Sequence, residues 1–327
     1  MNPPAQTLPA FGDVLAAAAR IAPHAHATPV LRSRSLDALV GAQLHFKAEH
    51  LQRAGAFKFR GACNAVWSLT EEQAAHGVVT HSSGNHGAAL ALASRTRGIA
   101  CHVVVPEGAV ESKLAAIRAY GATLHRCAPT IAAREAMCAQ LQRDTGAILV
   151  HPYTDARVIA GQGTAALELV QQCDAQLDAL IVPVGGGGLA SGTALVARAL
   201  DTPLRVFLAE PAGAAETAAS LAAGHRVVDF TPDTICDGLR GTLGEPNFEL
   251  LNRDDVQALV VDDAQIVEAM RLLFSRLKQV IEPSSATVLA ALLAHRERFA
   301  GMRVGVVLSG GNVDLDAVGA LFAGHRA

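Results

Sequence analysis

The sequence predicts an α/β protein with two lobes, and three observations lead to that prediction. Short runs of valine, leucine and isoleucine alternate along the chain with alanine-rich segments of helical periodicity. Runs such as VVVP and VGVVL suit strands buried on both faces, which is typical of parallel sheets covered by helices. A chain of 327 residues is also longer than one ordinary core accommodates, so two lobes are expected.

The expected strands are short apolar runs that polar or turn residues bound on each side. In chain order they are residues 44–48, 77–81, 100–105, 122–126, 147–150, 180–184, 205–209, 258–261 and 304–308. The expected helices carry apolar residues at helical spacing, and the clearest are residues 88–97, 112–120, 132–144, 159–173 and 264–278. Strands that alternate with helices predict open, mostly parallel sheets with helices on both faces.

The two lobes must be joined through structured crossings, because no linker rich in Pro, Gly or Ser divides the chain. The strand and helix units between residues 77 and 150 are compact enough to form a sheet of their own. We therefore predict a small domain at residues 77–150 and a large domain made of residues 1–76 and 151–327.

The composition excludes several classes of protein. A formal charge of −3, with 27 lysines and arginines that form no runs, offers no basic surface for nucleic acid. No apolar stretch is long enough to span a membrane, and the N-terminus lacks the pattern of a signal peptide. The six cysteines never form CxxC, which favours reduced thiols over disulfides or structural zinc. We therefore expect a cytoplasmic protein.

Lys58 stands between Phe57 and Phe59 in the segment GAFKFRGACNAV. A solvent-facing lysine has no need of a phenylalanine on each side, whereas a buried one would lose its charge. A neutral, desolvated amine is the form that condenses with carbonyl groups. Strand-like alternation would point both phenylalanines away from the amine. The segment leaves a choice between a surface lysine and a buried, reactive one.

Three loops follow expected strands, at the strand ends where ligands collect in such sheets. HSSGNHG, residues 81–87, presents hydroxyls and amides at a helix N-terminus, which suits a carboxylate or forms a plain N-cap. VPVGGGGLASG, residues 182–192, lets backbone amides crowd round a phosphate, with a tight turn as the alternative. LSGGNVD, residues 308–314, offers either similar groups or a cap and turn.

The glycine run also admits a different cofactor. Residues 185–187 with Ala190 loosely match GxGxxA, and Glu210 ends a later strand at about the spacing of a ribose-binding acid. A nicotinamide-dependent dehydrogenase would explain these features but leaves Lys58 and Ser309 without a role. A two-lobed binding protein for amino acids would explain the architecture, but such proteins usually work outside the cytoplasm.

Taken together, GAFKFRGA, SSGNHGAALA, PVGGGGL, AEPAGA, IEPSSA and LSGGNVD resemble the serine racemase and serine/threonine dehydratase family. These are pyridoxal-phosphate enzymes of fold type II, the tryptophan-synthase-β-like fold. The resemblance runs from about residue 28 to 314, and AFKFRGACNAV, HPY and ICDGLR are most similar to plant-type serine racemases. It implies a two-lobed homodimer in which the large domain binds the cofactor and the small, mobile domain lies on the substrate side.

The resemblance assigns Lys58 to the covalent attachment of pyridoxal phosphate. The other implied cofactor-binding residues are Phe57, Asn85 at the phenolic oxygen, Gly185, Gly186, Gly187 and Gly188 at the phosphate, and Ser309 at the pyridine nitrogen. A hydroxyl at that nitrogen leaves it largely neutral. A mild electron sink of this kind favours loss of a β-substituent, or quick reprotonation, over transamination.

The resemblance also implies the residues that handle an amino-acid substrate. Lys58 would remove the α-proton, and Ser83 is the acid on the opposite face in the racemases. The implied substrate-binding residues are Ser82, Ser83, Gly84, Asn85 and His86 for the carboxylate, and Arg134, which as a lone arginine is otherwise a surface residue. Ser285 replaces a family glycine close to the cofactor and could narrow the pocket.

A cation site is implied at Glu210, Ala214 and Glu216, where the family binds magnesium or calcium with two acids and one backbone carbonyl; manganese is a further possible ion. Hard oxygen ligands suit these ions. Glu216 stands where an aspartate is usual, and two exposed carboxylates are the alternative interpretation.

The resemblance predicts dehydration and deamination of L-serine, L-threonine or a related β-hydroxy amino acid to an oxo acid and ammonia, with some serine racemase activity. The alternative is an enzyme that is primarily a serine racemase, and a nicotinamide-dependent dehydrogenase is the distant one. In each case the partner is a small molecule, not a nucleic acid or a membrane.

Overall fold

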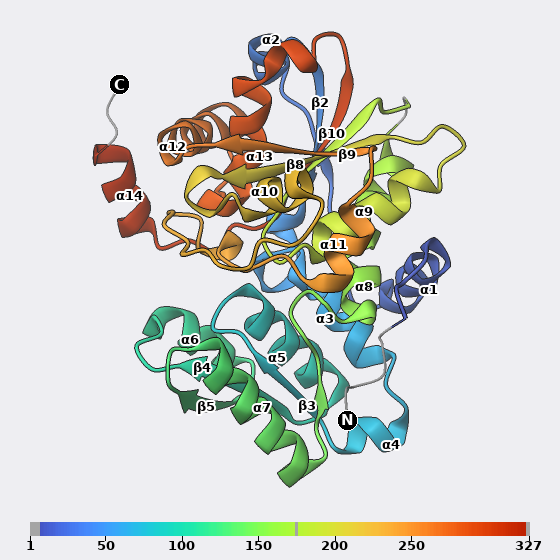
Figure 1. Cartoon of the computed structure of the whole chain (residues 1–327), viewed down its shortest axis with the longest axis vertical. Helices are drawn as coiled ribbons and strands as arrows, with labels where there is room; N and C mark the ends of the chain where they lie inside the picture. Colours follow the sequence, from blue (N-terminus) through green and yellow to red (C-terminus); the bar gives the residue numbers. More distant parts are fainter. Residues whose placement is uncertain (1–6, 174–175, 325–327) are drawn as a thin grey trace.

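The structure is a computed structural model that describes residues 7–173 and 176–324, and the chain forms two sheets (Figure 1). The larger sheet has six strands in the order β1-β2-β10-β7-β8-β9. These strands are β1 (Val30–Leu31), β2 (Gln43–Ala48), β7 (Ala179–Pro183), β8 (Arg205–Pro211), β9 (Val256–Val261) and β10 (Arg303–Leu308). β1 is antiparallel to β2, and all other neighbours are parallel.

The smaller sheet has four strands in the order β5-β4-β3-β6, and every pair is parallel. The strands are β3 (Val78–His81), β4 (Cys101–Pro106), β5 (Thr123–Cys127) and β6 (Ile148–Leu149). In Figure 1 this sheet lies below the larger one with α5, α6 and α7, while α3 and α8 run between the two sheets.

The helices cover both faces of each sheet. They are α1 (Phe11–Ile21), α2 (Arg34–Val40), α3 (Lys58–Trp67), α4 (Glu71–Ala75), α5 (Asn85–Arg97), α6 (Glu111–Ala119), α7 (Ile131–Thr145), α8 (Ala156–Gln172), α9 (Gly188–Arg198), α10 (Glu216–Ala223), α11 (Glu245–Leu251), α12 (Asp263–Leu272), α13 (Pro283–Ala294) and α14 (Leu315–Gly324). One face of the larger sheet packs on α8 and α9, and the other on α12 and α13. The predicted α/β class, with two mostly parallel, helix-covered sheets, is confirmed.

Glycines bring α3, α8 and α9 into backbone contact. A Cβ atom on Gly161 of α8 would lie 2.6 Å from the Cα atom of Gly61 of α3. A Cβ atom on Gly192 of α9 would lie 2.5 Å from the backbone nitrogen of Gly163 of α8. Since real Cβ atoms do not approach other atoms so closely, these three helices pack at a distance that only glycine allows.

Two elements differ from the expected ones. The helix expected at residues 264–278 ends as an α-helix at Leu272 and continues as a π-helical turn, Leu273–Leu277, which stops at the left-handed residue Lys278, φ +60°. β1 was not expected, because two residues are too few to show a period.

Candidate active site

Lys58 is the first residue of α3, and the residues before it are tied to the loop that follows β10. Phe57 N donates a hydrogen bond to Ser309 O at 2.9 Å. Ala56 forms an isolated antiparallel bridge with Gly310. Two loops that are distant in sequence therefore meet at the start of the lysine helix.

The two phenylalanines beside Lys58 have different surroundings. Phe57 has helical backbone angles, φ −51° and ψ −24°, so this segment does not have the alternation of a strand. The Phe57 ring does not point away, since its centroid lies 5.1 Å from Lys58 Nζ. Phe59 is fully buried in the hydrophobic core that α3 shares with α5. One phenylalanine therefore contacts the amine, and the other anchors the helix.

The half-buried Lys58 amine lies against a backbone carbonyl. Nζ donates a hydrogen bond to Pro152 O at 3.1 Å. Burial lowers the pKa of Lys58 to about 8, and the negative charge of Glu282 opposes this shift. At pH 7 roughly one amine in ten is then neutral and nucleophilic, far more than for an ordinary lysine.

The glycine loop forms a narrow cradle at the N-terminus of α9. A Cβ atom on Gly186 would lie 2.4 Å from the Tyr153 ring, and one on Gly187, φ +92°, would lie 2.6 Å from Leu243 Cδ1. Within residues 7–173 and 176–324, no group accepts a hydrogen bond from the backbone N–H of Gly185, Gly186 or Gly187. Free amides at the start of an 11-residue helix fit a phosphate.

The SSGN loop lies between β3 and the start of α5, with Ser82, Ser83 and Gly84 all half-buried. Gly84 N donates to Ser82 Oγ at 3.4 Å. The first residue of α5 is Asn85, whose Nδ2 donates to both carboxylate oxygens of Glu282, at 3.0 and 3.1 Å. Glu282 was not predicted as a site residue, and its place in the motif IEPSSA was its only signal.

Two histidines beside the amine are held neutral. Burial lowers the pKa of His86 well below its usual value, and the positive charge of Lys58 adds to this. His86 Nε2 lies 3.3 Å from Val150 O. Burial also lowers the pKa of His151 to about 3, with His81 and Lys58 contributing. Uncharged imidazoles line this side of the site.

The row of rings His81, His151 and Tyr153 was not predicted. The His151 ring centroid lies 5.0 Å from that of His81 and 4.6 Å from that of Tyr153. Arg134 of α7 is half-buried. Burial lowers the pKa of His81, and the positive charge of Arg134 adds to this shift. The motif HPY was the only sequence signal for His151 and Tyr153.

The acid pair, Glu210 and Glu216, lies near the glycine loop, because Leu243 contacts both Glu216 and Gly187. Glu210 and Glu216 are 1% and 4% exposed, so the alternative of two exposed carboxylates is wrong. The Glu210 oxygens accept hydrogen bonds from two amides in the first turn of α10, at 2.9 Å each. Glu216 accepts one from Leu243 N at 2.6 Å. Burial raises the pKa of Glu210 to about 7 and also raises that of Glu216.

Two carboxylates in a desolvated site fit a bound cation, with the Ala214 carbonyl in the adjoining 3₁₀ turn, Ala212–Ala214. In the part of the chain that the structure describes, no group of three or more His, Cys, Asp or Glu residues could hold a metal ion.

Two buried serines occupy the remaining predicted positions. Ser309, at the end of β10, is 3% exposed. Ser285 is fully buried in the first turn of α13, and its hydroxyl has no hydrogen-bond partner among the described residues. The neighbouring Ser284 Oγ accepts a hydrogen bond from Gly238 N at 3.0 Å.

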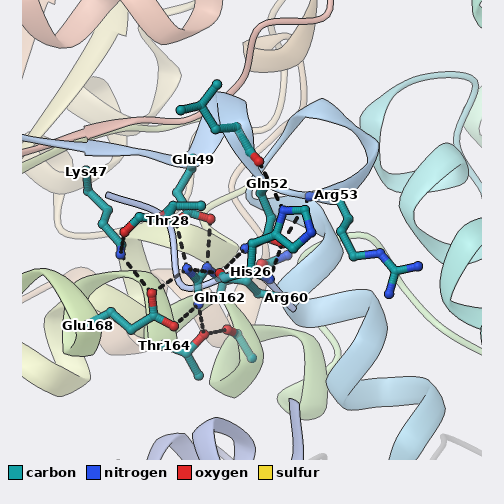
Figure 2. Close-up of polar contacts among 12 residues, drawn as sticks. His26, Thr28, Lys47, Glu49, Gln52, Arg53, Arg60, Gln162, Thr164 and Glu168 are labelled. Carbon is teal, nitrogen blue, oxygen red and sulfur yellow. Dashed lines mark hydrogen bonds and ion pairs between the residues drawn. The ribbon is translucent and has the colours of Figure 1, made fainter. Parts of the chain in front are cut away.

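A cluster of buried ion pairs holds the first turn of α3, the helix that begins at Lys58 (Figure 2). Arg60, in the first turn of α3, is fully buried and binds both oxygens of Glu49, at 2.7 and 2.8 Å. It binds both oxygens of Glu168 of α8 at the same two distances. Lys47 Nζ reaches Glu168 at 2.7 Å, so two cations and two anions balance.

Comparisons with known proteins agree with this geometry. The family profile described as "Pyridoxal-phosphate dependent enzyme" matches residues 21–310. The chain is 48% identical to a β-hydroxyaspartate dehydratase of Paracoccus denitrificans, over 94% of this chain and 98% of that protein. The crystal structure of serine racemase from Dictyostelium discoideum is 47% identical, with a TM-score of 0.89 and 94% and 99% of the two chains covered.

A structure of maize serine racemase is 43% identical, with a TM-score of 0.92 and 98% of each chain covered. No helix among the described residues is long and apolar enough to cross a membrane. The family match favours pyridoxal phosphate over a nicotinamide cofactor. A profile that spans most of the chain, together with relatives so similar over almost their whole length, means that the chain belongs to the family of pyridoxal-phosphate-dependent enzymes.

Proposed function

We propose that the enzyme eliminates water from L-serine, L-threonine or a related β-hydroxy amino acid, giving an oxo acid and ammonia, with some racemisation of serine. The observation that carries the proposal is the Lys58 amine, whose pKa is lowered to about 8 by burial. Relatives named β-hydroxyaspartate dehydratase and serine racemase support the two reactions. An enzyme that is primarily a serine racemase is the second candidate.

The residues around Lys58 would hold pyridoxal phosphate as follows. Lys58 would hold it covalently, the backbone amides of Gly185, Gly186, Gly187 and Gly188 would bind its phosphate, and the Asn85 side chain would donate to its phenolic oxygen. Ser309 would face its ring nitrogen, with Phe57 beside the amine. When bound, the cofactor withdraws electrons from the substrate α-carbon.

The chain's own groups would then move protons around the substrate. The hydroxyls and amides of the SSGNHG loop, Ser82, Ser83, Gly84, Asn85 and His86, would bind the carboxylate, with Arg134 approaching from α7. Lys58 would remove the α-proton as a general base. Loss of the β-hydroxyl gives elimination, whereas return of a proton from Ser83 on the opposite face gives the D-enantiomer.

Further features belong to the same proposal. Glu210, Glu216 and the Ala214 carbonyl would bind Mg²⁺, or Ca²⁺ or Mn²⁺, and so offset the desolvation of the two carboxylates. Residues 77–150 would be the small mobile domain, and residues 1–76 with 151–327 the large cofactor-binding one. The active form would be a cytoplasmic homodimer.

The proposal is tested with the purified protein and Lys58→Ala. The wild type should be yellow, and borohydride reduction should fix the cofactor mass on the peptide that contains Lys58. Lys58→Ala should lose both, while Lys278→Asn, at an exposed left-handed position that asparagine tolerates, should keep both. A colourless protein that never takes up pyridoxal phosphate would contradict the proposal.

The substrate is then identified by incubating the wild type separately with L-serine, L-threonine and L-threo-3-hydroxyaspartate. Oxo acid and D-enantiomer are measured in the same tube. Excess oxo acid supports elimination as the main activity, and excess D-enantiomer supports the racemase alternative.

A further inference from the structure

We infer that Asn312 is a positioning residue of the proposed active site, and that it acts by fixing the orientation of the Asn85 side-chain amide. The inference rests on the proposed function, in which Asn85 donates a hydrogen bond to the bound cofactor. Asn312 lies in the loop after β10, in the motif LSGGNVD. Neither its chemistry nor its distance from Lys58 in the sequence predicts this role.

One chain of hydrogen bonds joins four separate segments. Asn312 Nδ2 donates to Ala54 O at 2.8 Å and to Asn85 Oδ1 at 2.9 Å. Asn85 Nδ2 in turn donates to the two Glu282 oxygens, at 3.0 and 3.1 Å. This series of hydrogen bonds therefore links the turn before Lys58, the β10 loop, the start of α5 and the N-cap of α13.

The donor-to-acceptor direction of these hydrogen bonds is determined at both ends of the series. The Ala54 carbonyl and the Glu282 carboxylate can only accept hydrogen bonds, so each must face an amide N–H group. If either asparagine were flipped, an acceptor oxygen would face another acceptor. The only consistent arrangement places Asn312 Nδ2 between Ala54 and Asn85, and Asn85 Nδ2 toward Glu282.

This arrangement leaves the Asn85 Nδ2 group as the donor for a bound molecule. Its Oδ1 accepts from the Asn312 amide, and one Nδ2 hydrogen, shared between the two Glu282 oxygens, accounts for both of those contacts. The second Nδ2 hydrogen is the group that remains for a bound molecule. An acceptor such as a phenolic oxygen fits this donor, and without Asn312 only Glu282 would oppose a rotation that presents the Asn85 oxygen instead.

The turn before Lys58 is shaped around Asn312. Ala54 adopts φ +58°, which is uncommon for a residue with a side chain. Gly55 follows with φ +71°, and a Cβ atom there would lie 2.2 Å from Asn312 Oδ1. The strained backbone of Ala54 and the glycine at position 55 both allow the loop to contact Asn312. Backbone strain of this kind is typical of functional sites.

The test compares Asn312→Asp and Asn312→Ala with the control Asn252→Asp. Asn312 is exposed, so water can replace its amide in the alanine variant. Aspartate cannot donate, so it reverses the required polarity at Asn85. Asn252 is an exposed asparagine after α11, and it controls for the added charge.

Two readouts besides activity are used: titration of the apoenzyme with pyridoxal phosphate, and the visible absorption of the bound cofactor as a function of pH. We expect Asn312→Asp to weaken cofactor binding about tenfold and to shift the pH titration of the cofactor absorption. The reason is that a turned Asn85 amide no longer donates its hydrogen bond to the phenolic oxygen, which is charged when ionised. Asn312→Ala should weaken binding about threefold at most. Asn252→Asp should leave both readouts unchanged.

A double-mutant cycle shows whether Asn312 acts through Asn85. In an Asn85→Ala background, Asn312→Asp should lose most of its effect, since there is no amide left to orient. Equal losses in both backgrounds, or an Asn312→Asp protein that matches Asn252→Asp, would overturn the inference. If aspartate unfolds the protein, Asn312→Ala in the same cycle decides the matter.

The failure of this inference differs from the failure of the proposed function. A wild type that binds pyridoxal phosphate on Lys58 and tolerates Asn312→Asp overturns only the role of Asn312. A wild type that binds no pyridoxal phosphate overturns both.

Discussion

At the scale of single residues, the reactivity of Lys58 depends on two opposing effects. Burial lowers the pKa of its amine to about 8, and the nearby carboxylate of Glu282 opposes this shift. A carboxylate beside a base disfavours proton abstraction, since it stabilises the charged amine. It also accepts the Asn85 hydrogen bond, so one side chain affects both the base and its neighbour.

Replacing Glu282 by glutamine should lower the pKa of Lys58 further, because the charge that favours the ammonium form is removed. The pH at which the apoenzyme combines half-maximally fast with pyridoxal phosphate should therefore fall below that of the wild type. Asp178→Asn is the matched control, since Asp178 pairs with Arg303 at the opposite, amino end of β7. An unchanged midpoint in Glu282→Gln would contradict this account of Lys58.

At the scale of elements, α3 is held by ion pairs that contribute more to position than to stability. Desolvating the two cations and two anions around Arg60 cancels much of their attraction. A well-packed apolar cluster would hold the helix as firmly, but with less precise geometry. The bidentate contacts to Glu49 and Glu168 instead fix the first turn of the helix, which carries Lys58.

Arg60→Met should destabilise the protein by about 3–5 kcal/mol, because it leaves two carboxylates with too few buried partners. The free energy of unfolding in denaturant measures this loss. Arg118→Met, which breaks an exposed pair with Glu111, should leave that free energy nearly unchanged. If Arg60→Met and Arg118→Met lowered the free energy of unfolding by similar amounts, the buried cluster would contribute no more to stability than an exposed ion pair.

At the scale of the whole molecule, the acid pair should link stability to pH and cations. The pKa of Glu210 is raised, to about 7, so its folded form binds a proton more tightly than its unfolded form. Its contribution to stability is therefore present at low pH and is lost as pH rises through about 7. A bound cation would restore stability where the carboxylate is charged.

Excess MgCl₂ should accordingly raise the unfolding temperature by a few degrees at pH 8 and have little effect at pH 5.5. Glu210→Gln should abolish this gain. Glu72→Gln, on the exposed side of α4, should keep it. An equal rise at both pH values would point to a general salt effect and against binding at Glu210.

The sequence predicted the fold well, because parallel strands buried on both faces leave continuous apolar runs such as VVVP. Side-chain chemistry predicted a phosphate site at the glycine loop, and the resemblance assigned the role of Lys58. The orientation of Phe57 could not be predicted, since local alternation cannot reveal a helix that starts at Lys58. Glu282 and His151 escaped notice because their importance arises from contacts between distant segments. Two-residue strands such as β1 carry too little pattern to be found.

The close contact of α3, α8 and α9 through glycines has a consequence for how such an enzyme can change. Lys58 begins α3 and the glycine loop ends at the start of α9, so the main-chain contacts between α3, α8 and α9 hold these two segments close together. Under the proposed function, substitutions around the SSGNHG loop and His151 would alter which amino acid is accepted, while the spacing between the Lys58 helix and the glycine loop stays constant.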